Sequence, residues 1–458
     1  MAKPAITLRD LRKNKSIRVT GQEFFKPVKE ITIDSRSVTR KDCFVAIKGE
    51  RFDGHEFIPA VVAAGVKVII CNENYTPDSA LAACFISVTD TTAFLAELAG
   101  IKRSKYRGVI IGITGSNGKT TTKEIVKTIL SGKYNVHATS ANNNNHIGVP
   151  LTIYELDNRH DAAVIEMGTN HFGEIEYLAK TVKPDMAVIT NIGPSHLEFL
   201  IDFDGVFKEK RALFEEVIRS KGTLIVNRDD KYLRTYLKSY KRTVSFGSKK
   251  ADVSCSMGEI NEDGTQKITI RAKNFKLKAD SPLIGEHNAL NIASAVAVAL
   301  KLGLKKKHIK ESIAKLVPAK HRLNFIKAGE ATIIDDTYNS NPNSVTAALK
   351  VLKAVAGKKM KVVALGDMFE LGDTSESSHR ELAGPVMKIK PSMVLLLGKH
   401  MKHLYEELKS DYDRVFHFDS REEYGKKIKS LSGKQMFILL KGSRGMKMEE
   451  FINQLTEI

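Results

Sequence analysis

The residues best suited to chemistry form a glycine-rich loop at residues 112–120, which read G-I-T-G-S-N-G-K-T. A β-rich run at 109–114 leads into it, and Lys119 opens a segment with helical spacing up to residue 130. Glycines let backbone N–H groups wrap around phosphates, and a helix N-terminus adds positive potential. Lys119 can then reach the β- and γ-phosphates, and the Thr120 hydroxyl can ligate Mg²⁺. The loop therefore predicts a site for ATP or GTP without specifying the reaction.

The loop departs from the G-x-x-x-x-G-K-[ST] consensus at one position, because Ile113 occupies the place of the first glycine. An ordinary glycine-rich turn between a strand and a helix is the alternative interpretation. The lysine and threonine at the required offsets argue against that alternative. The loop residues predicted to bind the nucleotide are Gly115, Ser116, Asn117, Gly118, Lys119, Thr120 and Thr121.

The elements around the loop indicate a central domain at 107–320, which alternates short apolar strands with helical stretches. Such alternation favours a parallel sheet covered by helices on both faces. Residues 243–278 alternate in shorter runs around Asp263-Gly264, which predicts antiparallel hairpins.

The 458-residue length fits about three domains. Residues 1–106 predict a small α/β domain, in which a helix at 91–103 ends in the basic stretch 102–105, interpreted as a linker. Residues 321–458 restart the strand–helix alternation and predict a second doubly wound, Rossmann-like domain. The fold class is therefore α/β with three domains.

Composition excludes several classes of protein. Hydrophobic residues make up 42% of the chain, which argues against wholesale disorder. No run of 18 apolar residues occurs, and the first thirty residues lack the apolar core of a signal peptide, so we expect neither membrane insertion nor secretion. The four cysteines are scattered without a C-x-x-C pair, as expected for reduced thiols in a cytoplasmic protein.

The formal net charge of +19 is compatible with nucleic acid, anionic lipid or acidic small substrates as partners. The lysines and arginines are, however, spread along the whole chain in pairs and triplets. No zinc-finger spacing, RNP-like aromatic motif or long basic arm accompanies them. We therefore interpret most of this charge as solvated helix faces and expect no nucleic-acid partner.

Further polar motifs follow in order along the chain: D-S-R at 34–36, N-N-N-N-H-I-G-V-P at 142–150, E-M-G at 166–168, N-I-G-P-S-H at 191–196, G-E-H-N-A-L-N at 285–291, D-D-T-Y-N-S-N-P at 335–342, L-G-D-M-F-E-L-G at 365–372 and K-G-S-R at 441–444. Together with the loop, whose departure at Ile113 is normal there, these motifs resemble the Mur ligases over nearly the whole chain.

The resemblance implies a magnesium site at Thr120, Glu166, His196 and Lys210. Lys210 matches a lysine that is carbamylated in the family, a modification that turns a cation into a carboxylate supporting the metal. Its spacing of fourteen residues from His196 is intact, but Ile201-Asp202 replaces the usual Gly-Ser and Ala212 replaces a glutamate.

The resemblance also assigns the substrates. It implies that Asn288 and Asn291 contact adenine, that Asp336 faces the ribose and that Arg322 meets the ATP phosphates. Residues implied in binding the other substrate are Ser35 and Arg36, which would contact UDP, and Asn145. The residues implied in catalysis are Lys119, His196, Lys210 and Arg322.

The activity implied by the resemblance is ATP-dependent formation of an amide bond through an acyl phosphate. The D-D-x-Y-N-x-N-P motif favours the branch that adds D-alanyl-D-alanine to UDP-N-acetylmuramoyl-tripeptide. Ligases that add diaminopimelate or lysine typically carry D-N-P-R instead. We accordingly expect ATP and two Mg²⁺ ions as cofactors, a monomer, and a cytoplasmic role in making peptidoglycan precursors.

Three alternatives remain open. The nearest is another ligase of the same superfamily, such as a folylpolyglutamate ligase or a different muramyl-peptide ligase. The UDP-type first domain argues against the folate branch, and testing amino-acid and dipeptide acceptors separately would distinguish the others. The second is a P-loop NTPase switch or nucleic-acid motor, which predicts hydrolysis that needs no acceptor. The third is a catalytically inactive scaffold, which the presence of Lys119, Glu166 and His196 argues against.

Overall fold

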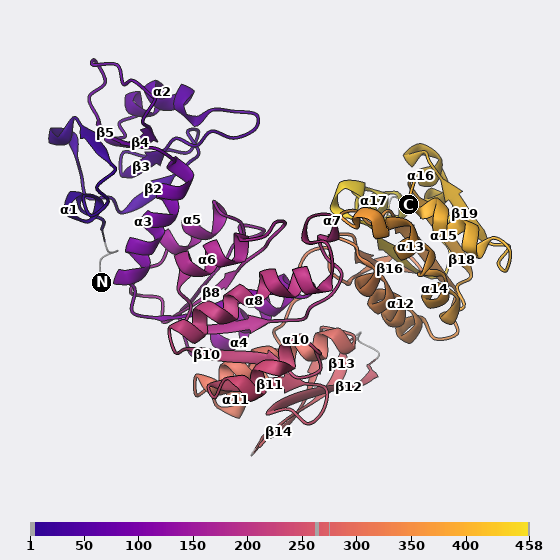
Figure 1. Cartoon of the computed structure of the whole chain (residues 1–458). Coiled ribbons are helices and arrows are strands. Elements are labelled where there is room, and N and C mark those ends of the chain that lie inside the picture. The colour runs from indigo at the N-terminus through magenta and orange to yellow at the C-terminus, as the bar shows by residue number, and fades with distance from the viewer. Residues whose placement is uncertain (1–4, 262–264, 274, 457–458) are drawn as a thin grey trace.

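The computed structural model describes residues 5–261, 265–273 and 275–456. In this described part of the chain three sheets of five, nine and six strands form, each flanked by helices. The first and third domains lie on opposite sides of the central one (Figure 1). This arrangement confirms the predicted α/β class with three domains. None of the described helices is both long and apolar enough to cross a membrane.

The first domain contains a sheet of order β1-β5-β4-β3-β2, in which only β1 runs antiparallel. Its strands are β1 (Arg18–Thr20), β2 (Glu30–Thr32), β3 (Asp42–Val45), β4 (Val68–Asn72) and β5 (Cys84–Val88). Its helices are α1 (Leu8–Leu11), η1 (Gln22–Phe24), η2 (Gly54–Phe57), α2 (Ile58–Ala63) and α3 (Thr91–Lys105).

Helix α3 corrects the interpretation of residues 102–105 as a linker, because this basic stretch forms the last turn of the helix. Lys102 is completely buried, with its ammonium 5.3 Å from the centre of the Tyr154 ring. Arg103 donates to the carbonyl of Val182 at 3.1 Å and to Asp185 Oδ2 at 3.1 Å. The linker interpretation was wrong because a basic stretch looks solvated in sequence, whereas here it docks on the central domain.

The central domain contains a sheet of order β14-β13-β12-β11-β10-β9-β6-β8-β7. Its strands are β6 (Val109–Thr114), β7 (Val136–Ala138), β8 (Ala162–Glu166), β9 (Met186–Ile189), β10 (Thr223–Asn227), β11 (Thr243–Gly247), β12 (Val253–Ile260), β13 (Gln266–Ala272) and β14 (Phe275–Ser281). Its helices are α4 (Lys119–Leu130), α5 (Gly148–Tyr154), α6 (Glu174–Val182), α7 (Leu197–Leu200), α8 (Phe203–Arg219), η3 (Leu233–Thr235), α9 (Tyr236–Ser239), α10 (Glu286–Lys301) and α11 (Lys306–Ile313).

In the sheet order, every neighbouring pair from β7 through β8, β6, β9, β10 and β11 to β12 is parallel. The pairs β12–β13 and β13–β14 are antiparallel. The prediction of hairpins over 243–278 was therefore wrong for β11, which pairs in parallel with both β10 and β12. The predicted turn at Asp263-Gly264 lies outside the described residues. Strands β8 and β9 are buried along their whole length, as parallel strands with helices on both faces must be.

The third domain contains a sheet of order β15-β16-β20-β17-β18-β19, in which only β15 runs antiparallel. Its strands are β15 (Asn324–Ala328), β16 (Ala331–Asp336), β17 (Lys361–Gly366), β18 (Met393–Leu397), β19 (Val415–Phe418) and β20 (Phe437–Lys441). Its helices are α12 (Pro342–Ala356), η4 (Gly372–Thr374), α13 (Ser375–Arg380), α14 (Ala383–Lys388), α15 (Met401–Leu408), α16 (Arg421–Lys429), η5 (Arg444–Met446) and α17 (Glu450–Thr456).

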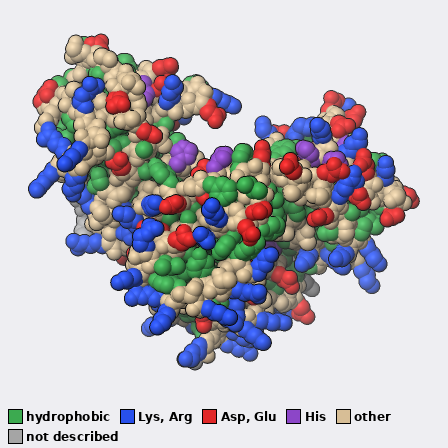
Figure 2. Space-filling view, in the orientation of Figure 1, with side chains coloured by type: hydrophobic (Ala, Val, Ile, Leu, Met, Phe, Trp, Pro, Cys, Tyr) green, Lys and Arg blue, Asp and Glu red, His purple; other side chains and the backbone are tan. Residues whose placement is uncertain are grey.

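Positive side chains cover all three domains on the face shown in Figure 2, and they are densest at the lower end of the central domain. The same view shows a hollow between the first and third domains. The spread of charge over the surface agrees with the interpretation of solvated faces.

The structure explains the departure Ile201-Asp202 between α7 and α8. Ile201 has φ 70° and ψ −63°, a conformation in which glycine is unstrained and a β-branched residue is not. Asp202 caps α8, because its side chain accepts a hydrogen bond from Gly205 N at 2.8 Å. Aspartate therefore caps the helix as a serine would, whereas isoleucine introduces backbone strain.

We expect Ile201→Gly to raise the free energy of unfolding by about 1 kcal/mol, since it removes this strain at a position that is 74% exposed. The control Ile201→Ala keeps a Cβ and should give no such gain. Urea unfolding followed by circular dichroism measures the difference, and equal stability of the glycine and alanine variants would contradict the strain argument.

Candidate functional site

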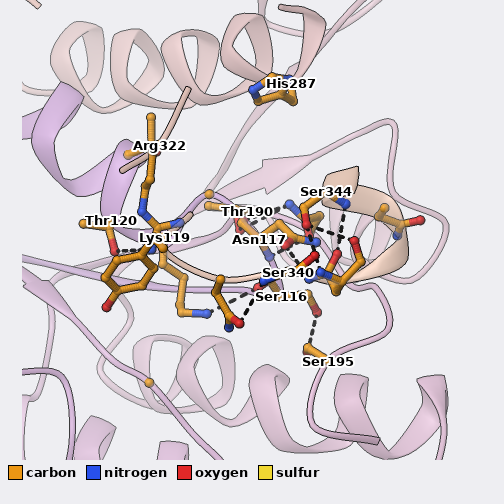
Figure 3. A pocket seen from close by; sticks show the side chains of 18 of the residues that line it. Ser116, Asn117, Lys119, Thr120, Thr190, Ser195, His287, Arg322, Ser340 and Ser344 are labelled. Atoms are coloured by element: carbon orange, nitrogen blue, oxygen red, sulfur yellow. Dashed lines mark hydrogen bonds between the residues drawn. The ribbon is translucent and has the colours of Figure 1, made fainter. Parts of the chain in front are cut away.

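The largest concentration of predicted site residues lines a cavity of about 540 Å³ between the central and third domains. On the central side its walls come from the ends of β6, β8 and β9 and from the start of α10 (Figure 3). On the other side they come from the ends of β16 and β20 and from the segment after β17. Open parallel sheets bind ligands at the carboxyl ends of their strands, and here two sheets present these ends to one cavity.

The phosphate loop requires its glycines. Gly115 has φ 146°, and a Cβ there would lie 1.9 Å from Thr190 Oγ1. Gly118 has φ 80°, and a Cβ there would lie 2.7 Å from Asn291 Oδ1. Ile113 is instead a fully buried residue of β6, so the departure from the consensus falls within the strand and leaves the loop itself intact.

Lys119 begins α4, and its ammonium donates to the Gly115 carbonyl at 2.8 Å and to the Ser116 carbonyl at 3.4 Å. Burial lowers its pKa, and the positive charge of Arg322 adds to this effect, while Glu166 opposes it. The side chain thus lies against the loop, where its positive charge would attract a phosphate group.

Glu166, at the end of β8, offers the acidic oxygen nearest to the loop. Its Oε1 accepts hydrogen bonds from Thr120 Oγ1 at 3.1 Å and from Asn144 Nδ2 at 2.9 Å. Its Oε2 is buried and has no hydrogen-bond partner in the described part of the chain. A buried carboxylate oxygen without a partner is costly, and a cation would satisfy it.

The oxygen ligands here fit Mg²⁺. Among the described residues no three His, Cys, Asp or Glu side chains converge as a metal-binding group. Mg²⁺ does not need such a group, since it is typically bound by one or two carboxylates together with substrate phosphates and water. Glu166 Oε2 and the Thr120 hydroxyl therefore suffice as the protein's share of one magnesium site.

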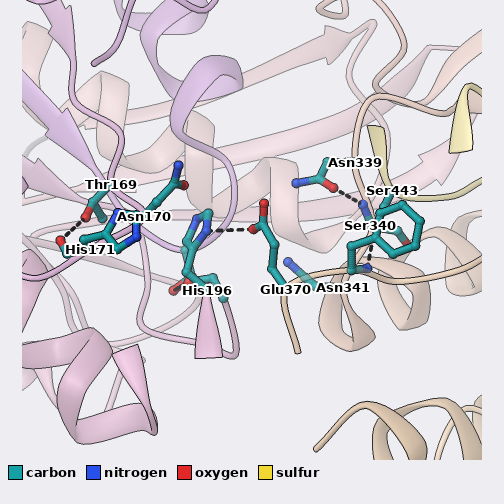
Figure 4. A network of polar contacts seen from close by, with 12 residues as sticks. Thr169, Asn170, His171, His196, Asn339, Ser340, Asn341, Glu370 and Ser443 are labelled. Carbon is teal, nitrogen blue, oxygen red and sulfur yellow. Dashed lines mark hydrogen bonds and ion pairs between the residues drawn. The ribbon is translucent and has the colours of Figure 1, made fainter. Parts of the chain in front are cut away.

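His196 lies across the cavity from Glu370 of the third domain. Its Nδ1 lies 2.7 Å from Glu370 Oε2 (Figure 4). The contact with His196 lowers the pKa of Glu370. His196 itself has φ 54° at the N-terminus of α7.

Lys210 lies in α8 behind the cavity wall and does not line the cavity. It is 1% exposed, and burial together with the charge of Lys119 lowers its pKa well below the usual range, although Glu209 opposes this. Carbamylation requires the neutral, nucleophilic amine, and the lowered pKa favours that form.

Arg322 enters the cavity from the start of the third domain. Its guanidinium stacks on the Tyr338 ring, 4.1 Å from the ring centre, and its Nη2 lies 3.4 Å from Thr120 Oγ1. Asp336, at the end of β16, accepts from Lys441 Nζ at 2.6 Å and from Leu323 N at 3.2 Å. The structure thus brings both predicted nucleotide-binding residues of this domain to the cavity.

The predicted adenine residues Asn288 and Asn291 also line the cavity, on one face of α10. Asn291 Nδ2 donates to Asn288 Oδ1 at 3.1 Å, and Thr122 Oγ1 donates to Asn291 Oδ1 at 3.2 Å. The second bond joins α10 to α4. Burial lowers the pKa of the adjacent His287.

Not every predicted residue lies at this cavity. Gly115, Ser35 and Arg36 do not line it. Ser35 and Arg36 follow β2 in the first domain, where the exposed Arg36 side chain makes two bonds of 2.8 Å to Asp34. Asn145 does line the cavity, but its Oδ1 accepts from Gly148 N at 2.8 Å and so caps α5.

Sequence reasoning missed three residues that the structure brings to the cavity. They are Glu370, Lys441 and Asn341, whose Nδ2 donates to Asn117 Oδ1 at 2.7 Å across the domain boundary. Each lies in a motif that was recognised, namely 365–372, 441–444 and 335–342. The signal was present, but without partners from the other domain it indicated no role.

Comparisons with known proteins match all three domains. Residues 27–103 match the Mur ligase family catalytic domain, 113–299 the Mur ligase middle domain and 321–444 the Mur ligase glutamate ligase domain. The UDP-N-acetylmuramoyl-tripeptide–D-alanyl-D-alanine ligase of Bacillus subtilis (strain 168) is 34% identical, with 93% of each chain covered.

Solved structures agree. A crystal structure of MurF from Acinetobacter baumannii has a TM-score of 0.89 and 32% identity, with 100% of each chain covered. The MurF ligase of Thermotoga maritima in complex with ADP has a TM-score of 0.84 and 27% identity, covering 94% of this chain and 97% of that one.

Lys119→Met should lower kcat for nucleotide turnover by about 10²- to 10³-fold, because it removes the positive charge at the predicted phosphate site. Lys127→Met, on the exposed side of the same helix, is the matched control and should leave kcat unchanged. Release of ADP measured by a coupled assay checks both. Similar rates for the two variants would remove Lys119 from the phosphate site.

Proposed function

This chain belongs to the Mur ligase family, and from this premise we propose that it joins D-alanyl-D-alanine to UDP-N-acetylmuramoyl-tripeptide in peptidoglycan precursor synthesis. It is an ATP-dependent ligase that forms a C–N bond and releases ADP and phosphate. Relatives of this activity align over nearly the whole chain.

One structural observation carries the proposal. A phosphate loop, a buried carboxylate oxygen without a partner and an arginine from another domain meet within one cavity. A ligase needs a site built between domains, because it must hold a nucleotide and two further substrates together while water is excluded.

The first step activates the substrate. A free carboxylate is a poor electrophile at pH 7, so the terminal carboxylate of the tripeptide attacks the γ-phosphorus of ATP, giving an acyl phosphate and ADP. Phosphoryl transfer depends on positioning and on neutralising charge rather than on covalent help from the protein. Lys119 and Arg322 approach the phosphates from opposite domains and supply positive charge, and Mg²⁺ held at Thr120 and Glu166 would neutralise the remainder.

In the second step the amine of D-alanyl-D-alanine attacks the acyl carbon, the amide bond forms and phosphate leaves. The third domain closes the cavity through Asn117–Asn341 and His196–Glu370. Closure keeps water from hydrolysing the acyl phosphate. In this scheme Asp336 faces the ribose, Asn288 and Asn291 the adenine, and Ser35, Arg36 and Asn145 the nucleotide-sugar peptide.

We further propose two Mg²⁺ ions and a carbamylated Lys210. In its neutral form the Lys210 amine would add to CO₂ and lose one proton, leaving a carboxylate whose charge acts on Lys119 of the phosphate loop. The low pKa of the buried amine supports this reaction. A second carboxylate would also compensate the charge of Lys119, which the bare lysine repels.

The remaining expectations form part of the same proposal. We propose domain boundaries at 106/107 and 320/321, a monomer, a cytoplasmic location and no nucleic-acid partner. UDP-MurNAc-tripeptide ligases match the first domain as well as the other two, which supports a muramyl-peptide ligase over a folate ligase or a nucleic-acid motor.

The decisive measurement is ADP release with UDP-MurNAc-tripeptide, in the presence and absence of D-Ala-D-Ala. We expect release to depend on the dipeptide, because the acyl phosphate has no other acceptor in a closed cavity. Single amino acids serve as control acceptors. Release that is independent of an acceptor, or absent with both substrates, would contradict the proposal.

Lys210→Ala should lose activity and regain part of it when short carboxylic acids are added, because these replace the carbamate. Lys208→Ala, on the same helix but outside the buried face, is the control and should remain active without rescue. An active Lys210→Ala enzyme would remove Lys210 from the site.

A further inference from the structure

The acceptor places a requirement on the cavity that the groups described so far do not meet. The α-amine of a peptide has a pKa near 8, so D-alanyl-D-alanine arrives mostly as an ammonium ion. Lys119, Arg322 and Lys441 all line the cavity and repel it. A carboxylate must therefore attract the ammonium to the neighbourhood of the acyl phosphate.

Four acidic side chains line the cavity, namely Glu166, Glu174, Asp336 and Glu370. Glu166 is buried beside Thr120, where its free oxygen suits a cation of the nucleotide. Asp336 is held by Lys441 Nζ at 2.6 Å and by Leu323 N at 3.2 Å. Glu174 accepts from the backbone of Asn170 at 2.7 Å and so fixes its own loop. Three of the four acids are thus engaged.

Glu370 differs from these three. Its side chain is 45% exposed, against 35% for Glu174 and 14% for Asp336, so a ligand can reach it. His196 contacts its Oε2, and no hydrogen bond to its Oε1 is found in the described ranges. Its carboxylate reaches from the third domain toward His196 (Figure 4).

The backbone of Glu370 is a second, independent observation. Glu370 has φ 63°, a left-handed conformation that costs a non-glycine residue free energy, and it follows directly on Phe369 and precedes Gly372 at φ 53°. The strain persists where tertiary packing holds it: Phe369 N donates to Ser443 Oγ at 2.8 Å. Strained residues of this kind concentrate at ligand-binding positions.

Glu370 also lies on the wall of the cavity that the third domain provides, opposite the phosphate loop. Lys119, at the phosphate loop, is close enough for the charge of Glu370 to act on it. An amine bound at Glu370 therefore approaches the acyl phosphate from the third domain, opposite the loop that holds the nucleotide.

Resting on the proposed function, we propose that Glu370 binds the ammonium group of the dipeptide acceptor and so determines that the acceptor is an amine. The interaction is a charge-assisted hydrogen bond from the ammonium to the Glu370 carboxylate, made before the amine gives one proton to solvent water and attacks the acyl carbon.

The test is Glu370→Gln, which keeps the size and the contact with His196 but removes the charge. We expect the KM for D-Ala-D-Ala to rise about tenfold or more, with KM for ATP and for the UDP-MurNAc-tripeptide within about twofold of wild type. Glu370→Asp, which retains the charge in a shorter side chain, should give an intermediate KM. Glu198→Gln removes an exposed acid from the neighbouring α7 and should change none of these values.

Hydroxylamine separates binding of the ammonium from mere domain closure. This small neutral nucleophile captures the acyl phosphate as a hydroxamate, with release of phosphate, and needs no ion pair. Glu370→Gln should form hydroxamate at the wild-type rate, which also shows that it is folded. Equal losses of hydroxamate and dipeptide product would assign Glu370 to domain closure and overturn the inference, as would an unchanged KM for the dipeptide.

The two proposals fail in distinguishable ways. If the wild-type enzyme forms hydroxamate but ignores D-Ala-D-Ala, the proposed acceptor is wrong and the inference about Glu370 falls with it. If the wild-type enzyme uses the dipeptide and Glu370→Gln keeps its KM, only the inference about Glu370 is wrong.

Discussion

Gly115 lies so close to Thr190 that no side chain fits between the phosphate loop and the end of strand β9. Hydrogen bonds maintain this approach: Ser116 N donates to the Asn191 carbonyl at 3.0 Å, and Thr190 Oγ1 donates to the Asn117 carbonyl at 2.6 Å. The loop therefore takes its shape from the neighbouring strand and not from its own sequence alone. Lys119, which starts the next helix, and His196, which follows β9, are positioned by this same contact.

The contact also connects the central domain to the third. Asn117, fixed by the end of β9, accepts the hydrogen bond from Asn341. Arg322 is flanked by His321 and Leu323, which both have positive φ values, so the chain bends sharply where it delivers the guanidinium to Thr120. Several non-glycine residues in left-handed conformations, His196, Ile201 and Glu370 among them, thus lie at one domain junction. Tertiary contacts there outweigh local backbone preference.

The charges in the cavity also come from both domains. The positive groups Lys119 and Arg322 come from different domains, and the charge of Arg322 contributes to the lowered pKa of Lys119. Three acids of the cavity face different neighbours: Glu166 the expected metal, Asp336 the Lys441 ammonium and Glu370 the His196 ring. A polyphosphate nucleotide and its metal would balance the charges of Lys119, Arg322 and Glu166.

Local sequence was sufficient where a structure depends on neighbours along the chain. The alternation of strands and helices predicted three α/β units, and the ends of β6 and α4 were obtained to the residue because buried runs, glycines and helical periodicity are local signals. Local sequence failed to predict the structure of residues 102–105 and the pairing of β11. Burial of a basic helix end and the pairing partner of a strand both depend on residues far away in the chain.

The sequence by itself determined the types of group at the site: a phosphate loop, hard oxygen ligands, a lysine at the family's spacing from His196 and a set of motifs in family order. Only the tertiary structure decided which of them meet. It placed Lys210 behind the cavity wall, left one oxygen of Glu166 without a partner, and brought Glu370 to His196 across the domain boundary. The physical reason is that electrostatic and hydrogen-bond energies depend on distances between atoms, and distances between residues far apart in the chain are set by packing.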